Sequence, residues 1–126
     1  MENDLKFTMT AIIAAVKSGK EISIRISGTS MLPTFQNGDM VCIRSHPNYQ
    51  VGDILVIIRN DHFIVHRLVG LMVTSKGKYY LTKGDHNTFV DRWYPHQKVL
   101  ARLNSNRQAR MKQLKHFYPS RFRMLL

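Results

Sequence analysis

The sequence predicts a single, mainly β domain with a helix at each end. Between residues 21 and 103 the apolar residues fall in short runs separated by Gly, Asn, Asp and Pro, a pattern typical of an antiparallel barrel or sandwich. The 126 residues contain no internal repeat and no low-complexity linker. We therefore expect one domain, built from an N-terminal helix (1–20), a β core (21–103) and a basic helical tail (104–126).

Residues 3–18 have the periodicity of an amphipathic helix. Its apolar residues recur at helical spacing and are Leu5, Met9, Ile12, Ile13 and Val16. Asn3 is expected to be the N-cap, and Gly19 is expected to end the helix. Because basic residues are sparse on the polar face, the pattern favours a helix that packs on the core over one that lies on a lipid surface.

The pattern changes to that of strands after Glu21. The predicted strands are residues 22–26, 40–44, 54–59, 62–71, 71–74, 79–82 and 99–103. Residues 22–26 alternate between Ile and polar side chains, which indicates a half-buried strand. Residues 54–59 are almost continuously apolar, and the Asn60-Asp61 turn that follows predicts a hairpin. A second helix is expected over residues 104–117 and ends before Pro119.

The charge of the chain is strongly basic and unevenly distributed. The formal net charge is +11, from 19 Lys and Arg against 8 Asp and Glu, and no acidic residue follows Asp91. A basic half of this kind is compatible with binding to nucleic acid or anionic lipid, and equally with a solvated helix.

Several classes of protein are disfavoured by the composition. Cys42 is the only cysteine, so we expect neither an intrachain disulfide nor a cysteine-based zinc site, and no metal or cofactor. The apolar run at residues 7–16 is shorter than the roughly 20 residues needed to cross a bilayer. It also lacks the basic residues that open a signal peptide. No membrane span is therefore expected.

The residues with candidate chemistry are a serine, a histidine and two aspartates. Ser30 lies in a turn of small residues that Pro33 and the Asn37-Gly38-Asp39 turn keep from continuing as a helix. It is a candidate nucleophile or an ordinary loop serine. His66 lies on a predicted strand, either as a general base or as a core histidine bonded to a carbonyl group. Asp85 and Asp91 could orient such a base, or could simply cap their own turns.

Five short segments, taken in order, resemble the conserved boxes of type I signal peptidases. They are GTSMLP (28–33), GD (38–39), VGDI (51–54), VHRLVG (65–70) and LTKGDHN (81–87), the last followed by Asp91. The bacterial branch of that family has a lysine where His66 stands, whereas the archaeal and endoplasmic-reticulum branch has histidine. The sequence therefore resembles the histidine branch.

This resemblance implies a fold and a set of roles. The fold is the β-rich one shared with self-cleaving repressors of the LexA type. Ser30 matches the nucleophile, His66 the general base, Asp91 the catalytic aspartate and Asp85 a supporting aspartate. The backbone N–H of Ser30 matches one oxyanion donor. Gly28 stands where many relatives have a serine as the second donor, so that donor is unassigned, with Thr29 or Ser27 as candidates.

The resemblance also implies a substrate and a way of binding it. Family substrates bind as extended strands with small side chains at the first and third residues before the cut. Residues 22–26 are expected to offer a free sheet edge for such a strand. The residues expected to contact the substrate are Ile24, Ile26, Gly28, Met31 and Pro33.

The sequence thus predicts a serine endopeptidase that removes a leader or signal segment from a peptide or preprotein. Because no anchor is expected, it would work in the cytoplasm or lie peripherally on an anionic membrane through its basic C-terminal tail. The alternative is a non-enzymatic or self-cleaving LexA-like regulator that binds nucleic acid through its basic half, although no helix-turn-helix is evident. Self-cleavage would need an internal scissile segment, for which the small-residue candidates are Ala14-Ala15 and Ala101.

Overall fold

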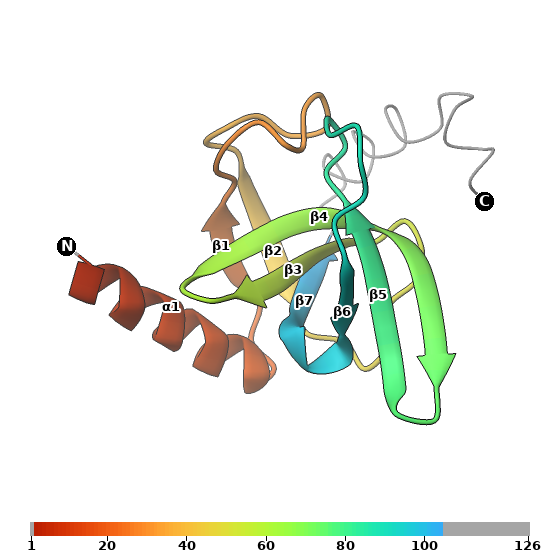
Figure 1. The fold of residues 1–126 in the computed structure, drawn as a ribbon. Coiled ribbons are helices and arrows are strands. Elements are labelled where there is room, and N and C mark those ends of the chain that lie inside the picture. Colours follow the sequence, from red (N-terminus) through yellow and green to blue (C-terminus); the bar gives the residue numbers. More distant parts are fainter. Residues whose placement is uncertain (1, 105–126) are drawn as a thin grey trace.

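A computed structural model describes residues 2–104, which form one helix and a single antiparallel sheet (Figure 1). The elements are α1 (Glu2–Lys17), β1 (Ile22–Arg25), β2 (Met40–Arg44), β3 (Ile54–Arg59), β4 (His62–Thr74), β5 (Gly77–Lys83), β6 (Trp93–Pro95), the 3-10 turn η1 (His96–Lys98) and β7 (Val99–Asn104). The strand order across the sheet is β1-β2-β7-β3-β4-β5-β6. The mainly β fold class is confirmed. Of the helix predicted over residues 104–117, only Asn104 is described, and it is the last residue of β7; the rest lies outside the described residues.

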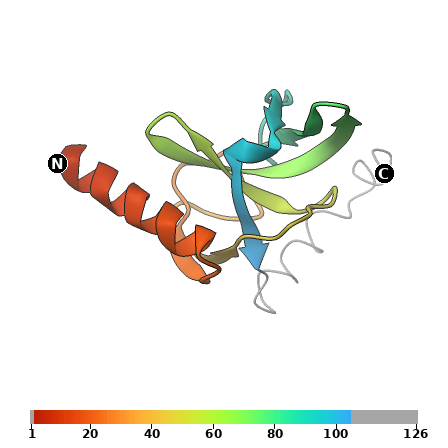
Figure 2. The ribbon, with the colours of Figure 1, turned by 90° about the horizontal axis from the view of Figure 1, so that it is seen from below.

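Helix α1 packs on one end of this sheet through its C-terminal half. Val16 is fully buried in the core, and Ile12 and Ile13 pack against the same cluster. The helix ends where the sequence predicts, because Gly19 adopts a φ of +95° and the N–H of Lys20 donates to the carbonyl of Ala15. Figures 1 and 2 place α1 at one end of the molecule and the β4–β5 hairpin at the other.

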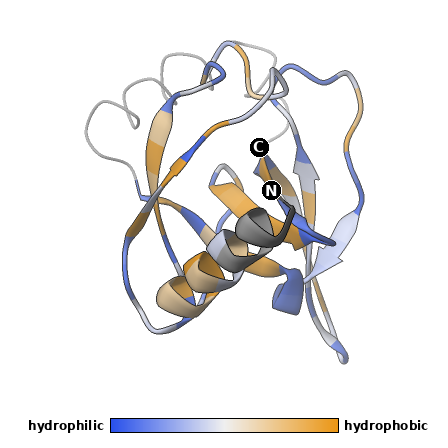
Figure 3. Cartoon of the chain, turned by 90° about the vertical axis from the view of Figure 1, so that its left-hand side faces the viewer, coloured by the Kyte–Doolittle hydropathy of each residue, from blue (hydrophilic) through white to orange (hydrophobic). Residues whose placement is uncertain are grey.

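The curled sheet buries apolar side chains on both of its faces. Alternate residues of β3 point to opposite sides, so Ile54 and Val56 join one core cluster while Leu55 and Ile57 join a second. Burial on both faces explains why this strand is continuously apolar. Figure 3 shows the same trend along the chain, with apolar residues concentrated on strands and on α1.

Besides shifts of one or two residues at the ends of β1, β5 and β7, the elements differ from the expectations at three places. Residues 62–71 and 71–74 form one continuous strand, β4, because the chain passes through Gly70 with a bulge between Leu68 and Gly70 and continues to pair with β5. Strand β6 and the turn η1 were not predicted at all. Helix α1 begins at Glu2, so Asn3 lies inside the helix and is not its N-cap.

Candidate active site

Two loops that are far apart in sequence meet at one end of the sheet, at the top of Figure 1. One follows β1 and carries Ser30; the other follows β5 and carries Asp85 and Asp91. The N–H of His86 donates to the Ser30 carbonyl at 2.8 Å. A Cβ at Gly84 would lie 2.8 Å from that same carbonyl oxygen, closer than a side chain can approach. The second loop therefore needs glycine at position 84 in order to pack against the first.

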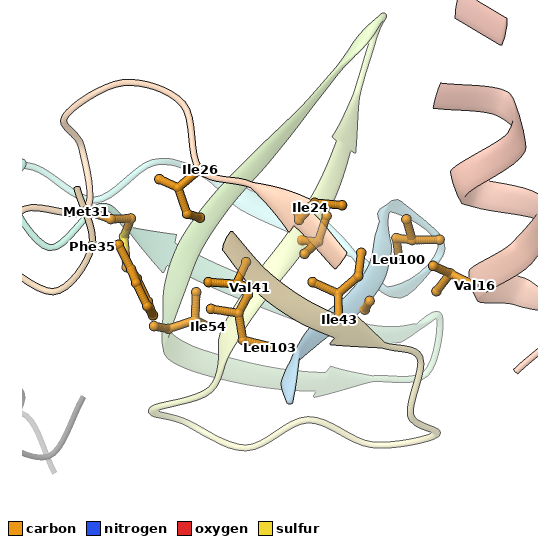
Figure 4. Close-up of a cluster of buried hydrophobic side chains, with 12 residues drawn as sticks. Val16, Ile24, Ile26, Met31, Phe35, Val41, Ile43, Ile54, Leu100 and Leu103 are labelled. Carbon is orange, nitrogen blue, oxygen red and sulfur yellow. The ribbon is translucent and has the colours of Figure 1, made fainter. Parts of the chain in front are cut away.

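The Ser30 loop is fixed by its own buried side chains. Met31 and Phe35 are inserted into the core cluster, where they lie beside Ile26 (Figure 4). The loop closes on itself because the N–H of Gly38 donates to the Ile26 carbonyl at 2.7 Å. The side-chain oxygen of Asn37 accepts from the N–H of Gly28 at 2.9 Å. These contacts hold the serine in place without a helix or strand.

Ser30, His66 and Asp91 form one chain of hydrogen bonds. Ser30 Oγ lies 3.1 Å from His66 Nε2, and His66 Nδ1 lies 2.5 Å from Asp91 Oδ2. An ionised carboxylate can only accept, so Nδ1 carries the proton and Nε2 of the neutral ring accepts from the serine hydroxyl. The histidine and aspartate side chains are only 12% and 18% exposed. This arrangement can move a proton from the serine to the histidine.

Thr82 fixes the carboxylate of Asp91 from a second direction. Its hydroxyl donates to Asp91 Oδ2 at 2.8 Å, and its carbonyl accepts from the Asp91 N–H, also at 2.8 Å. Burial alone would raise the pKa of the Asp91 carboxyl. Hydrogen bonds from His66 and Thr82, together with the charges of His66 and Arg59, outweigh burial, so this pKa lies below its ordinary value of 3.8.

Asp85 lies in a separate network that ties the two loops to β4. Arg67 donates two parallel hydrogen bonds to its carboxylate, from Nε at 2.9 Å and from Nη2 at 2.8 Å. Thr34, in the Ser30 loop, donates to the same carboxylate. Arg67 also donates to the Gly52 carbonyl at 2.9 Å. Asp85 therefore does not contact His66 but connects β4, the turn before β3 and the Ser30 loop.

Three residues of the site, Thr82, Thr34 and Arg67, have contacts that were not predicted from the sequence. A threonine within a strand is usual, and nothing in Thr82 itself indicates a partner nine residues away. The signal for Arg67 was its place in the VHRLVG segment next to His66.

The residues expected to contact a substrate lie in two kinds of environment. The side chains of Ile24, Ile26 and Met31 are buried in the core, whereas Gly28 and Pro33 are exposed, as is Thr29. A bound peptide could therefore reach the first three only through their backbone.

Two strand edges beside this site are unpaired within residues 2–104. Strand β1 is the last strand of the sheet and pairs only with β2. Residues 62–66 of β4 pair with β3 on one edge, but pairing with β5 on the other edge begins only at Arg67. The first edge leads toward Ser30 and the second ends at His66.

Within the described residues, no three His, Cys, Asp or Glu side chains lie together as metal ligands would. No helix in residues 2–104 is long and apolar enough to cross a membrane. The basic tail, proposed to contact a membrane, lies beyond residue 104.

Comparison with known proteins gives two matches. The family model described as Peptidase S24-like matches residues 2–87, which include Ser30, His66 and Asp85. The chain is also 36% identical over 81 residues to the "Signal peptidase complex catalytic subunit SEC11" of Plasmodium falciparum (isolate 3D7). That match covers 60% of this chain and 44% of the relative, so the chain spans less than half of the relative's length.

Proposed function

Because this chain belongs to the Peptidase S24-like family, we propose that it is a serine endopeptidase of the signal peptidase type. The observation that carries the proposal is the hydrogen-bonded chain of Ser30, His66 and Asp91. The similarity to a signal peptidase catalytic subunit supports a preprotein or leader peptide as the substrate. The proposal also treats residues 1–126 as a single peptidase domain.

In the first step, Ser30 Oγ attacks the carbonyl carbon of the scissile peptide bond. His66 Nε2 takes the hydroxyl proton and then delivers it to the leaving amine as the C–N bond breaks. The resulting acyl-enzyme is an ester on Ser30. Water hydrolyses this ester with His66 again acting as the base, which frees the new carboxyl end and restores the serine hydroxyl.

Asp91 would position the imidazole and stabilise its protonated form. The low pKa of Asp91 keeps its carboxylate ionised at neutral pH, so it accepts from Nδ1 throughout the cycle. Thr82 would act as a positioning residue because it constrains the carboxylate oxygen that the histidine uses.

The negative charge on the attacked oxygen needs preorganised donors. The backbone N–H groups of Ser30 and Thr29 donate no hydrogen bond to any described residue, so both are available as donors. Gly28 is a poorer candidate because Asn37 already accepts from its N–H. We assign the first donor to Ser30 and the second to Thr29.

The substrate would bind as an extended strand along the unpaired edges beside the site. Residues 62–66 of β4 offer backbone donors and acceptors up to His66, and β1 offers another edge toward Ser30. Gly28 and Pro33 would contact it directly, and Ile24, Ile26 and Met31 through their backbone. The proposal includes a preference for small side chains at the first and third residues before the cut.

It also includes peripheral association with an anionic membrane through the basic tail.

The proposal is tested with a leader peptide that has alanine at the first and third positions before the cut. Ser30→Ala and His66→Ala should each abolish cleavage, and a fluorophosphonate probe should label the parent at Ser30. Ser75→Ala, at an exposed serine of the β4–β5 turn, is the matched control and should retain labelling. Unchanged cleavage in both the Ser30 and His66 variants would disprove the mechanism.

The alternative of a self-cleaving regulator is less well supported by the described residues. Ala14-Ala15 lies within helix α1, and Ala101 is fully buried in β7, so neither candidate segment is extended and accessible. Incubating the parent alone distinguishes the two functions. A regulator would cut itself at a rate independent of protein concentration, whereas the proposed peptidase would cut only the added peptide.

A further inference from the structure

An open pocket lies at the opposite end of β5 from the Gly84-Asp85 loop. Its volume is 290 Å³, and it is lined by Pro47, by the start of β5 and by the β6–η1 connection. Three of the side chains around it can carry positive charge: Lys76, Lys78 and His96. The proposed peptidase mechanism uses none of these residues.

His96 is held rigidly in the wall of this pocket. Its Nδ1 lies 2.8 Å from the hydroxyl of Tyr80, and its ring lies against the rings of Tyr80 and Tyr49, at centroid distances of 5.7 and 6.2 Å. Burial, with a smaller contribution from Tyr49, raises the pKa of Tyr80, so the phenol keeps its proton. The Tyr80 hydroxyl has no other hydrogen-bond acceptor among the described residues, so we assign it as the donor to Nδ1, which places the proton of a neutral His96 on Nε2. A protonated ring carries a proton there as well. In both states Nε2–H remains a donor.

The positive charges of the pocket have no counter-charge among the side chains that the structure describes, those of residues 8–104. Lys78 donates to the side-chain oxygen of Asn48, which is neutral. No carboxylate lines the pocket. The carboxylates with described side chains are engaged elsewhere, as Glu21 is with Asn104, Asp53 with Arg102, and Asp85 with Arg67. Two lysines and a fixed N–H donor around one hollow thus form a concentrated positive field.

We propose that this pocket binds a phosphate group. A phosphate has several strong acceptor oxygens, so it can accept from the two lysines and from His96 Nε2–H at once, and its charge would offset their mutual repulsion. The group could belong to a free phosphate or to the headgroup of an anionic lipid. The chemistry recognised in the pocket is the same in both cases.

Binding is tested by titrating the full chain with inorganic phosphate at constant ionic strength, with chloride as the balancing anion, and recording ¹H–¹⁵N spectra. We expect saturable shifts at His96 and at the amides of Lys76 and Lys78. The variant Lys76→Gln/Lys78→Gln should bind about tenfold or more weakly, because a hydrogen bond to a charged group is worth roughly that factor. Lys20→Gln, at an exposed lysine after α1, is the control and should bind normally.

Vesicles distinguish the two sources of phosphate. If a lipid headgroup is the ligand, the chain should sediment with phosphatidylglycerol vesicles but not with phosphatidylcholine vesicles, and the double variant should bind the phosphatidylglycerol vesicles more weakly than Lys20→Gln does, even if the basic tail keeps some binding in both. If only free phosphate binds, the phosphate titration saturates but vesicle binding does not depend on Lys76 and Lys78. Shifts that do not saturate, or equal phosphate affinity in parent and double variant, would overturn the proposal.

Discussion

The buried ion pair between Arg67 and Asp85 gives a prediction that needs no substrate. The Arg67 side chain is only 3% exposed and that of Asp85 16%, and two hydrogen bonds of 2.9 and 2.8 Å join them. Asp85→Asn removes the negative charge but keeps the size of the side chain. It replaces the charged acceptor of the buried guanidinium with a neutral amide, and breaking a buried ion pair in this way typically costs about 3–5 kcal/mol.

The matched control is an exposed pair in the same chain. Asp61 and His62 lie 3.4 Å apart, with side chains 76% and 57% exposed, so Asp61→Asn should cost less than about 1 kcal/mol. Both variants are compared with the parent by urea unfolding at neutral pH, followed by circular dichroism. Asp85→Asn should lower the unfolding midpoint strongly and Asp61→Asn hardly at all. Equal, small losses in the two variants would refute the assignment of Asp85 to a network that joins the Ser30 loop to β4.

Two further predictions concern Asp91. Thr82→Val removes a hydrogen bond to a charged acceptor, which is worth about 1.5–3 kcal/mol, so kcat/KM for the leader peptide should fall roughly 10- to 100-fold. Thr82→Ser, which keeps the hydroxyl, should retain most of the parent's kcat/KM. An unchanged kcat/KM in Thr82→Val would rule out the positioning role. Because the folded pKa of Asp91 lies below its ordinary value of 3.8, its carboxylate stabilises the fold above that pH and loses this effect as pH falls through the lower value. The stability advantage of the parent over Asp91→Asn, measured by urea unfolding, should therefore be full at about pH 5 and shrink below about pH 4; an advantage that grows on acidification would contradict the sign.

The strands that could be predicted are those whose pattern is local. Residues 40–44 and 54–59 were predicted with the bounds that the structure gives, because alternation or a continuous apolar run between turn residues sets both ends. β4 was predicted as two strands that meet at Leu71, residues 62–71 and 71–74. In the structure the strand continues, and pairing with β5 begins at Arg67, where it leaves its pairing with β3. A change of partner of this kind depends on the tertiary structure.

Strand β6 was missed for a related reason. Trp93–Pro95 is three residues long, which is too short for a periodic signal, and it exists because it pairs with Tyr79, Tyr80 and Leu81 of β5. Neighbouring Trp93 also packs over Gly70, where a Cβ would lie 3.3 Å from its ring. Gly70 is thus a position where a side chain from another strand approaches closely.

The candidate site shows the same division between local and long-range information. Ser30, His66 and Asp91 could be selected because each chemistry-bearing residue stands in a recognisable segment. Thr82 and Thr34 could not, because a threonine's role depends on the carboxylate it meets across the fold. The two threonines donate to different aspartates. Thr82 donates to Asp91, whose carboxylate is hydrogen-bonded to His66. Thr34 donates to Asp85, which has no hydrogen bond with His66. Two aspartates six residues apart in one loop therefore make separate contacts, and we expect separable functions: Asp91 would position His66, and Asp85 would hold the Ser30 loop in place. Activity lost through Asp85 should accompany lost stability, whereas Thr82→Ser and Thr82→Val should differ in rate more than in stability.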